Sequence, residues 1–183
     1  MNKLKCSAIT AFILLGFIST IAQDKYKLIN SSVRFFSSTP VEDIEAENKA
    51  SLGVLDTKTG NFSVRVPITE FKFKSTLMED HFNENYMESE KYPNATFKGV
   101  IKDPINLGKD GVYKVTADGD FETHGVVQKR QIPLTITVAK GVVTYTSEFK
   151  VKLEDHQIKV PTVVFAKIAE VIDVKLNGEL QKI

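Results

Sequence analysis

Cysteine and tryptophan are nearly absent from this chain. One cysteine, Cys6, occurs in 183 residues, and tryptophan does not occur at all. Cys6 lies in an N-terminal segment that we expect to be removed, so the remaining chain has no thiol for a disulfide, a nucleophile or a metal ligand. We therefore expect one domain with a sizeable core, held together by packing alone.

Long apolar runs are also scarce, and the one that stands out lies at the N-terminus. Two lysines, an apolar core of 11 residues and a small-residue cleavage site follow one another at Lys3 and Lys5, Ala8 to Ile18, and Thr20 to Ala22. This order is typical of a signal peptide, and the core is shorter than the roughly 20 residues that span a bilayer. We predict a signal peptide at residues 1–22, a single domain at residues 23–183, and a periplasmic or secreted location.

Neither sign of charge is in large excess. The chain has 24 basic and 23 acidic side chains, and removal of Lys3 and Lys5 leaves 22 against 23. A nucleic-acid-binding protein needs a clear basic surplus to neutralise phosphates. We therefore expect no nucleic-acid partner.

What the chain does have is a period of two. Phe62, Val64 and Val66 alternate with Ser63 and Arg65, which is typical of a strand with one dry and one wet face. Similar runs occur at residues 71–74, 113–117, 132–138, 149–153 and 172–176, with further strands expected near 32–37 and 44–55. Eight or more strands separated by glycine-containing turns favour an all-β fold, an antiparallel barrel or a sandwich.

Alternation alone does not say which face is inside, because an outer-membrane barrel has the same period with its apolar face outward. Such a barrel usually carries aromatic girdles at both strand ends. Here the aromatics lie along the strands and lysine recurs on the polar face. These features favour an apolar interior.

One short segment departs from the strand pattern. Thr76 to Glu79 matches a capping box, and Met78, Phe82 and Tyr86 (or Asn85) recur at helical spacing. Pro93 prevents a helix from continuing further. We predict a helix from Thr76 to Met87 that covers one end of the barrel.

Three motifs in this order resemble the YceI-like family of secreted lipid-binding proteins. They are Met78, His81 and Phe82; Tyr92, Pro93, Ala95 and Phe97; and Gly119, His124, Gly125 and Val126. The resemblance implies a lipocalin-like antiparallel barrel that holds a long isoprenoid or other lipid chain. The chain departs from the family pattern at Phe121-Glu122, where the family usually has Leu-Thr. It departs again at 153–157, where an Arg-x-Asp-aromatic-Gly motif is often found.

Phenylalanine is the residue type that most suggests a ligand. Twelve occur, ten of them after residue 22, and rings at the rim of an eight-stranded barrel shape a slot for one slim ligand as readily as they fill a core. Our candidate ligand-binding residues are Phe35, Phe62, Phe71, Phe73, Met78, His81, Phe82, Phe97, Phe121, His124, Phe149 and Phe165.

Histidine is the residue that raises a metal or catalytic alternative. His81, His124 and His156 are spaced by 43 and 32 residues, which matches no metal-ligand motif. A hydrogen bond to a lipid head group or a purely structural role suits each of them. The family resemblance favours His81 and His124 over His156 as ligand contacts.

Signals for catalysis are weak. The chain has no G-x-S-x-G elbow and no glycine-rich phosphate loop, and adjacent carboxylates such as Glu154 and Asp155 would point to opposite faces of a strand. We predict a non-enzymatic carrier of a long-chain lipid or polyisoprenoid, as a monomer or homodimer, with no cofactor, metal or catalytic residue. The alternatives are an isomerase or hydrolase that uses a histidine at the barrel mouth, and a stress-related structural or interaction protein with a filled core.

Overall fold

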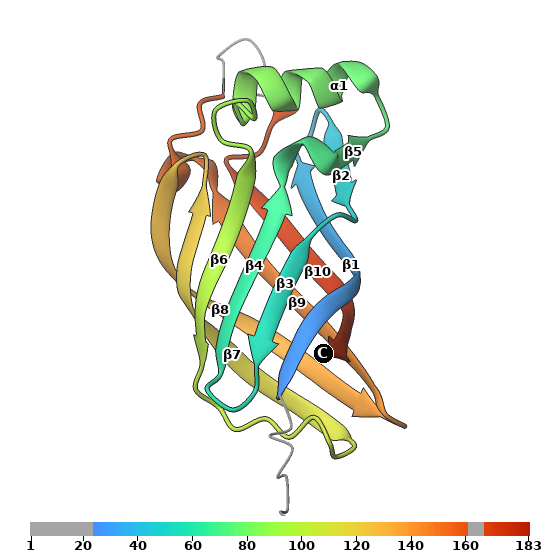
Figure 1. Ribbon diagram of the computed structural model, residues 1–183. Helices are drawn as coiled ribbons and strands as arrows, with labels where there is room; N and C mark the ends of the chain where they lie inside the picture. Colours follow the sequence, from blue (N-terminus) through green and yellow to red (C-terminus); the bar gives the residue numbers. More distant parts are fainter. Residues whose placement is uncertain (1–23, 161–166) are drawn as a thin grey trace, which may run out of the picture.

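The computed structural model describes residues 24–160 and 167–183, and folds them mainly into strands (Figure 1). The strands are β1 (Lys25–Ser38), β2 (Asp43–Asn48), β3 (Leu52–Asp56), β4 (Asn61–Pro67), β5 (Phe71–Phe73), β6 (Asn94–Ile101), β7 (Gly111–Thr123), β8 (Val126–Ala139), β9 (Val142–Lys152) and β10 (Val171–Lys182). The helical segments are η1 (Ile68–Glu70), α1 (Thr76–His81), η2 (Phe82–Tyr86) and η3 (Leu153–His156). The predicted signal peptide and Phe165 lie outside the described residues.

Eight of these strands form a closed antiparallel barrel. Hydrogen bonds follow the order β10-β9-β8-β7-β6-β4-β3-β1, and β10 pairs with β1 to close the ring. β2 and β5 extend the sheet from β1 near the end that α1 covers (Figure 1). The expected all-β barrel with one short helix is confirmed.

β1 changes its partner half-way along its length. Lys25 to Lys27 pair with β3, whereas Val33 to Ser38 pair with β2. Between these halves the register with β10 shifts, and Asn30 takes a φ of 49°. Asparagine tolerates this left-handed conformation better than most residues, so the bulge forms there and redirects the strand.

The buried apolar side chains form two clusters inside the barrel. One cluster of buried residues, with Ile136 at 0% exposure, fills the end remote from α1. A second cluster, around Ile68, Phe71 and Met87, lies beneath the helical segment. Lysines such as Lys98 and Lys114 are exposed on the outside, which agrees with the expected apolar interior.

The wall between β8 and β9 is paired over only part of its length. The ladder joins Thr135–Ala139 to Val142–Thr146 and stops beside Pro133, which has no N–H to donate. The Ser147 Oγ atom donates to the carbonyl oxygen of Pro133 at 2.6 Å. Side chains of β8 reach the carbonyl oxygens of Lys150 and Asp155 further along, so side-chain hydrogen bonds replace the backbone ladder here.

The helix begins where the sequence predicts, but its cap differs. Ser75 is the N-cap residue and makes no side-chain cap hydrogen bond, so the predicted capping box is wrong. Because the cap lies one residue earlier, Met78 occupies the third helical position and Glu79 the fourth. The Glu79 carboxylate instead accepts from Lys72 Nζ at 2.7 Å and from the Phe73 N–H at 3.4 Å. These bonds fasten α1 to β5, and the helical segment ends at Tyr86, one residue before the predicted Met87.

Candidate functional site

A cavity of about 540 Å³ runs inside the barrel. Leu28 and Leu180 line it at one end, and Met78 and Phe82 line it beneath the helical segment. Its volume falls in the range of roughly 300–1,000 Å³ that is typical of sites for small molecules. The interior is therefore not filled by side chains, contrary to the filled-core alternative.

Four phenylalanines meet where the helical segment covers the barrel. Phe35 on β1 stacks on Phe82 with ring centroids 5.4 Å apart, and Phe71 and Phe73 of β5 lie 5.6 and 5.0 Å from Phe82. Phe35 also contacts Phe71 at 5.3 Å. Centroid separations of this size are favourable for aromatic pairs. β1, β5 and η2 thus converge on one apolar mouth, which we call the phenylalanine mouth (Phe35, Phe71, Phe73 and Phe82).

A second row of rings continues along the inner wall. Phe62 and Phe97 lie 4.9 Å apart, Phe97 and Phe121 6.4 Å, and Phe121 and Phe149 6.1 Å. All four rings lie on the inner face of the barrel, because successive side chains of a strand point to opposite faces and these four occupy positions on the inner one. Ten of the twelve predicted site residues line the cavity: Phe35, Phe62, Phe71, Phe73, Met78, His81, Phe82, Phe97, Phe121 and Phe149. Ligand contact by these residues stays a prediction.

His124 is not among the residues that line the cavity. It lies in the two-residue turn between β7 and β8, where His124 and Gly125 have φ values of 52° and 72°. Its Nδ1 atom lies 3.0 Å from the carbonyl oxygen of His156, and its Nε2 atom lies 3.1 Å from a carboxylate oxygen of Glu88. The two ring nitrogens therefore contact a backbone carbonyl and a carboxylate, which both accept hydrogen bonds. The ring joins three segments at the helix end of the barrel.

His156 is fully buried beside the same turn. Its Nδ1 atom lies 3.2 Å from the carbonyl oxygen of Val126, and its ring packs edge-on against Phe121 at 5.2 Å. Burial lowers the pKa of this imidazole below its usual value. A neutral ring in this position packs η3 against the barrel wall.

Hydroxyl groups form part of the polar lining of the cavity, and sequence reasoning missed them. The Ser31 Oγ atom lies 2.6 Å from Ser51 Oγ and 2.7 Å from Tyr145 Oη, and all three residues line the cavity. Ser147 lines it as well. The inward positions of Tyr145 and Ser147 follow from the alternation of β9, but isolated serines carry no sequence signal of their own.

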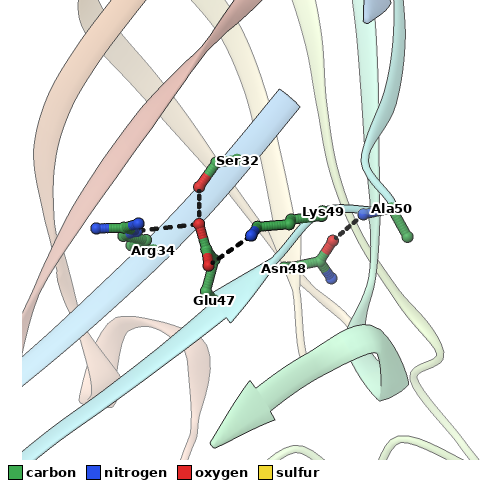
Figure 2. Close-up of polar contacts among 6 residues, drawn as sticks. All are labelled: Ser32, Arg34, Glu47, Asn48, Lys49 and Ala50. Atoms are coloured by element: carbon green, nitrogen blue, oxygen red, sulfur yellow. Dashed lines mark hydrogen bonds and ion pairs between the residues drawn. The ribbon is translucent and has the colours of Figure 1, made fainter. Parts of the chain in front are cut away.

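A polar network on the outside of β1 and β2 supports this wall (Figure 2). The Glu47 carboxylate accepts from Ser32 Oγ at 2.6 Å and Arg34 Nε at 3.1 Å, and it pairs with Lys49 Nζ at 3.2 Å. These donors, the Ser32 hydroxyl first, lower the pKa of Glu47 to about 2. The neighbouring Asn48 points to the other face, where its Nδ2 atom donates to the carbonyl oxygen of Pro67 at 2.7 Å and joins β2 to the end of β4.

The described residues show no grouping of metal ligands and no membrane-spanning helix. Among residues 24–160 and 167–183, no three histidine, cysteine, aspartate or glutamate side chains are grouped to hold a metal ion. Within the same ranges, no helix is both long and apolar enough to cross a membrane. The cavity offers mainly apolar surface, with several hydroxyl groups and the side chains of Glu42, His81 and Lys167 in its lining.

Comparison with known proteins places the chain in a family. The model of the YceI-like domain matches residues 26–180. The chain belongs to the YceI-like domain family. Two of the three motifs behind the resemblance, Met78-His81-Phe82 and Tyr92-Pro93-Ala95-Phe97, lie in the helical segment and in the stretch that leads into β6. In the third motif Gly119 lies on β7, and His124 and Gly125 form the β7–β8 turn, which contacts Glu88 at the same end of the barrel.

Solved structures share the YceI-like fold at low sequence identity. A polyisoprenoid-binding domain from Saccharophagus degradans superposes with a TM-score of 0.71 at 13% identity, over 88% of this chain and 99% of that chain. BcnA of Burkholderia cenocepacia gives 0.67 at 17% identity, over 82% and 96%. The YCEI protein of Campylobacter jejuni gives 0.54 at 19% identity, over 75% and 84%. No curated protein sequence matches the chain.

Proposed function

We propose that this protein binds one elongated amphiphilic lipid, such as a polyisoprenoid, with its tail inside the barrel. The observation that carries this proposal is the apolar cavity of about 540 Å³, which passes from the phenylalanine mouth toward Leu28 and Leu180. The similar domain of Saccharophagus degradans is described as polyisoprenoid-binding. That description supports the same class of ligand here.

Burial of a tail supplies enough free energy without a special polar site. Each buried methylene contributes about 0.8 kcal/mol, so a tail of roughly a dozen carbons gains several kcal/mol even after the entropic cost of fixing it is subtracted. The aromatic walls add contact area without polar groups that must be desolvated. Affinity then depends mainly on tail length and shape.

In this proposal the protein is a carrier and not an enzyme. It binds its lipid after export, in the periplasm or outside the cell. The predicted signal peptide supports export, and the mostly apolar lining of the cavity supports binding of a lipid tail. His81, which is exposed and lines the cavity, contacts the head group at the mouth.

Native mass spectrometry of the purified protein, followed by organic extraction, tests this function. We expect an added mass that is released as one lipid class and is chemically unchanged after incubation with the protein. A protein that neither retains a lipid nor takes up an added long-chain probe would contradict the proposal. Conversion of the lipid to a new product would show that the barrel is an enzyme.

A further inference from the structure

The hydroxyl groups of Ser31, Ser51 and Tyr145 form a polar site on the wall of a mostly apolar cavity. Each of the three residues is more than nine-tenths buried, with 6%, 5% and 6% of its surface exposed. They come from the bulge of β1, the turn before β3, and β9. Burial of a polar group costs free energy unless the group makes its hydrogen bonds. The question for this cluster is therefore whether each buried hydroxyl group has a partner.

Two irregularities of the backbone create the space for this site. The bulge after Ile29 places Ser31 on the inner face, and Gly178 on β10 pairs with Tyr145. A Cβ atom at residue 178 would lie 2.7 Å from the Tyr145 Oη atom, so a larger residue would displace the ring. Both features converge on the same hydroxyl groups.

Counting hydrogen bonds shows that the site has one donor to spare. Three hydroxyl groups carry three protons, and the two contacts of 2.6 and 2.7 Å use two of them. The described residues make no further hydrogen bond with the Ser51 or Tyr145 hydroxyl, at the two ends of this chain of hydroxyls. Burial raises the pKa of the Tyr145 phenol, so it stays protonated and able to donate.

We propose that these three hydroxyl groups recognise an oxygen atom, such as a carbonyl or hydroxyl oxygen, on the inserted part of the lipid. This inference rests on the proposed function, since it requires a chain inside the cavity. Ser31 precedes Phe35 of the phenylalanine mouth by four residues, or about 13 Å along an extended strand. The lipid oxygen that binds these hydroxyl groups therefore lies well inside the barrel, and it belongs to a different part of the lipid from the head group at the mouth.

Competition between two chains of equal length tests the inference. A fluorescent fatty-acid analogue is displaced from the exported form of the protein by tridecane or by methyl undecyl ketone, which differ by one carbonyl oxygen. We expect the ketone to bind about threefold to tenfold more tightly, as a buried neutral hydrogen bond would give. The double variant Tyr145→Phe/Ser51→Ala removes the hydroxyl groups at both ends of the chain and should reduce this preference, with tridecane affinity nearly unchanged.

Ser147→Ala is the matched control, because Ser147 lines the same cavity but already donates to Pro133. It should keep the preference for the ketone. Melting curves identify a variant that fails to fold. If the double variant is unstable, loss of the preference in either single variant, Tyr145→Phe or Ser51→Ala, supports the inference, and its persistence in both overturns it.

Each outcome distinguishes the two proposals. Equal affinity for the two chains in the unaltered protein, or a preference that survives both substitutions, overturns the inference while lipid binding stands. Failure of the protein to bind the fluorescent analogue or either chain overturns the proposed function itself.

Discussion

At the scale of single residues, the inner positions of the barrel are predictable and their polar contacts are not. Phe62, Phe97 and Phe149 line the cavity as alternation implies. The contact between Ser31 and Tyr145 spans 114 residues of sequence, and it depends on a bulge and on a glycine in a third strand. No local sequence pattern predicts a contact between residues so far apart, so the hydroxyl site could be identified only from the structure.

Glu47 gives a pH prediction at this scale. Its pKa lies at about 2 in the folded protein, below the ordinary value of 4.5, so the ionised network stabilises the fold above pH 4.5. This contribution is lost as the pH falls from 4.5 toward 2. Glu47→Gln should lower the free energy of unfolding by about 1 kcal/mol at pH 7, because the network lies near the surface.

Urea unfolding at pH 7 and near pH 2 measures this effect. The difference between the unaltered protein and Glu47→Gln should shrink at the lower pH. Glu45→Gln serves as the control, since Glu45 is exposed on the same strand and has no ion pair among the described contacts. A difference that stays constant with pH would show that Glu47 is not held ionised by its neighbours.

At the scale of elements, strand patterns are reliable here and the helix cap is not. Residues 44–55, expected to contain strand, form β2 and β3 with a turn at Lys49 to Ser51. The capping box fails because Glu79 bonds to Lys72 and Phe73, and these partners belong to β5. A tertiary contact thus overrides a local motif.

The helical segment is expected to act as a lid. Met78 and Phe82 line the cavity but neither is fully buried. Replacing both by serine should weaken retention of a fluorescent fatty-acid analogue about tenfold or more, because apolar contact at the mouth is lost. The free energy of unfolding should fall by less than the roughly 3–5 kcal/mol that truncation of a core phenylalanine costs.

Two controls separate a lid from plain core. Asp80→Ser, on an exposed position of the same helix, should change neither retention nor stability. Ile136→Val, in the filled end of the barrel, should cost about 0.5–1.5 kcal/mol in stability without affecting retention. Parallel loss of stability and retention in the Met78/Phe82 variant would argue that the helical segment is core.

At the scale of the whole molecule, closure of the barrel is what the sequence could least determine. β1 and β10 lie at opposite ends of the described chain, yet they pair along most of their lengths. The repeated alternation already favours a closed or sandwiched sheet, since a barrel removes exposed edges. The ring order and the cavity follow only from how these distant strands meet.

The N-terminal segment gives a prediction about export of the whole protein. The order of basic, apolar and small residues within residues 1–22 predicts cleavage after Ala22. We expect N-terminal sequencing of the protein from the cell-envelope or secreted fraction to begin at Gln23. Recovery of Met1 in that fraction would contradict this prediction.

Removal of the ligand should lower the melting temperature of the entire barrel, because the cavity borders both clusters of buried side chains. A ligand that binds only the folded protein stabilises it by about 2.7 kcal/mol when its free concentration is 100 times the Kd. For a barrel of this size we expect the melting temperature to rise by about 5–10 °C on loading, since each kcal/mol is worth about 2–4 °C. Calorimetry of the extracted protein, before and after a long-chain lipid is added back, measures the shift. The Met78/Phe82 double serine variant should show a smaller rise at the same lipid concentration, because its Kd is larger. An unchanged melting temperature in the unaltered protein at saturating lipid would mean that the lipid does not bind within the fold.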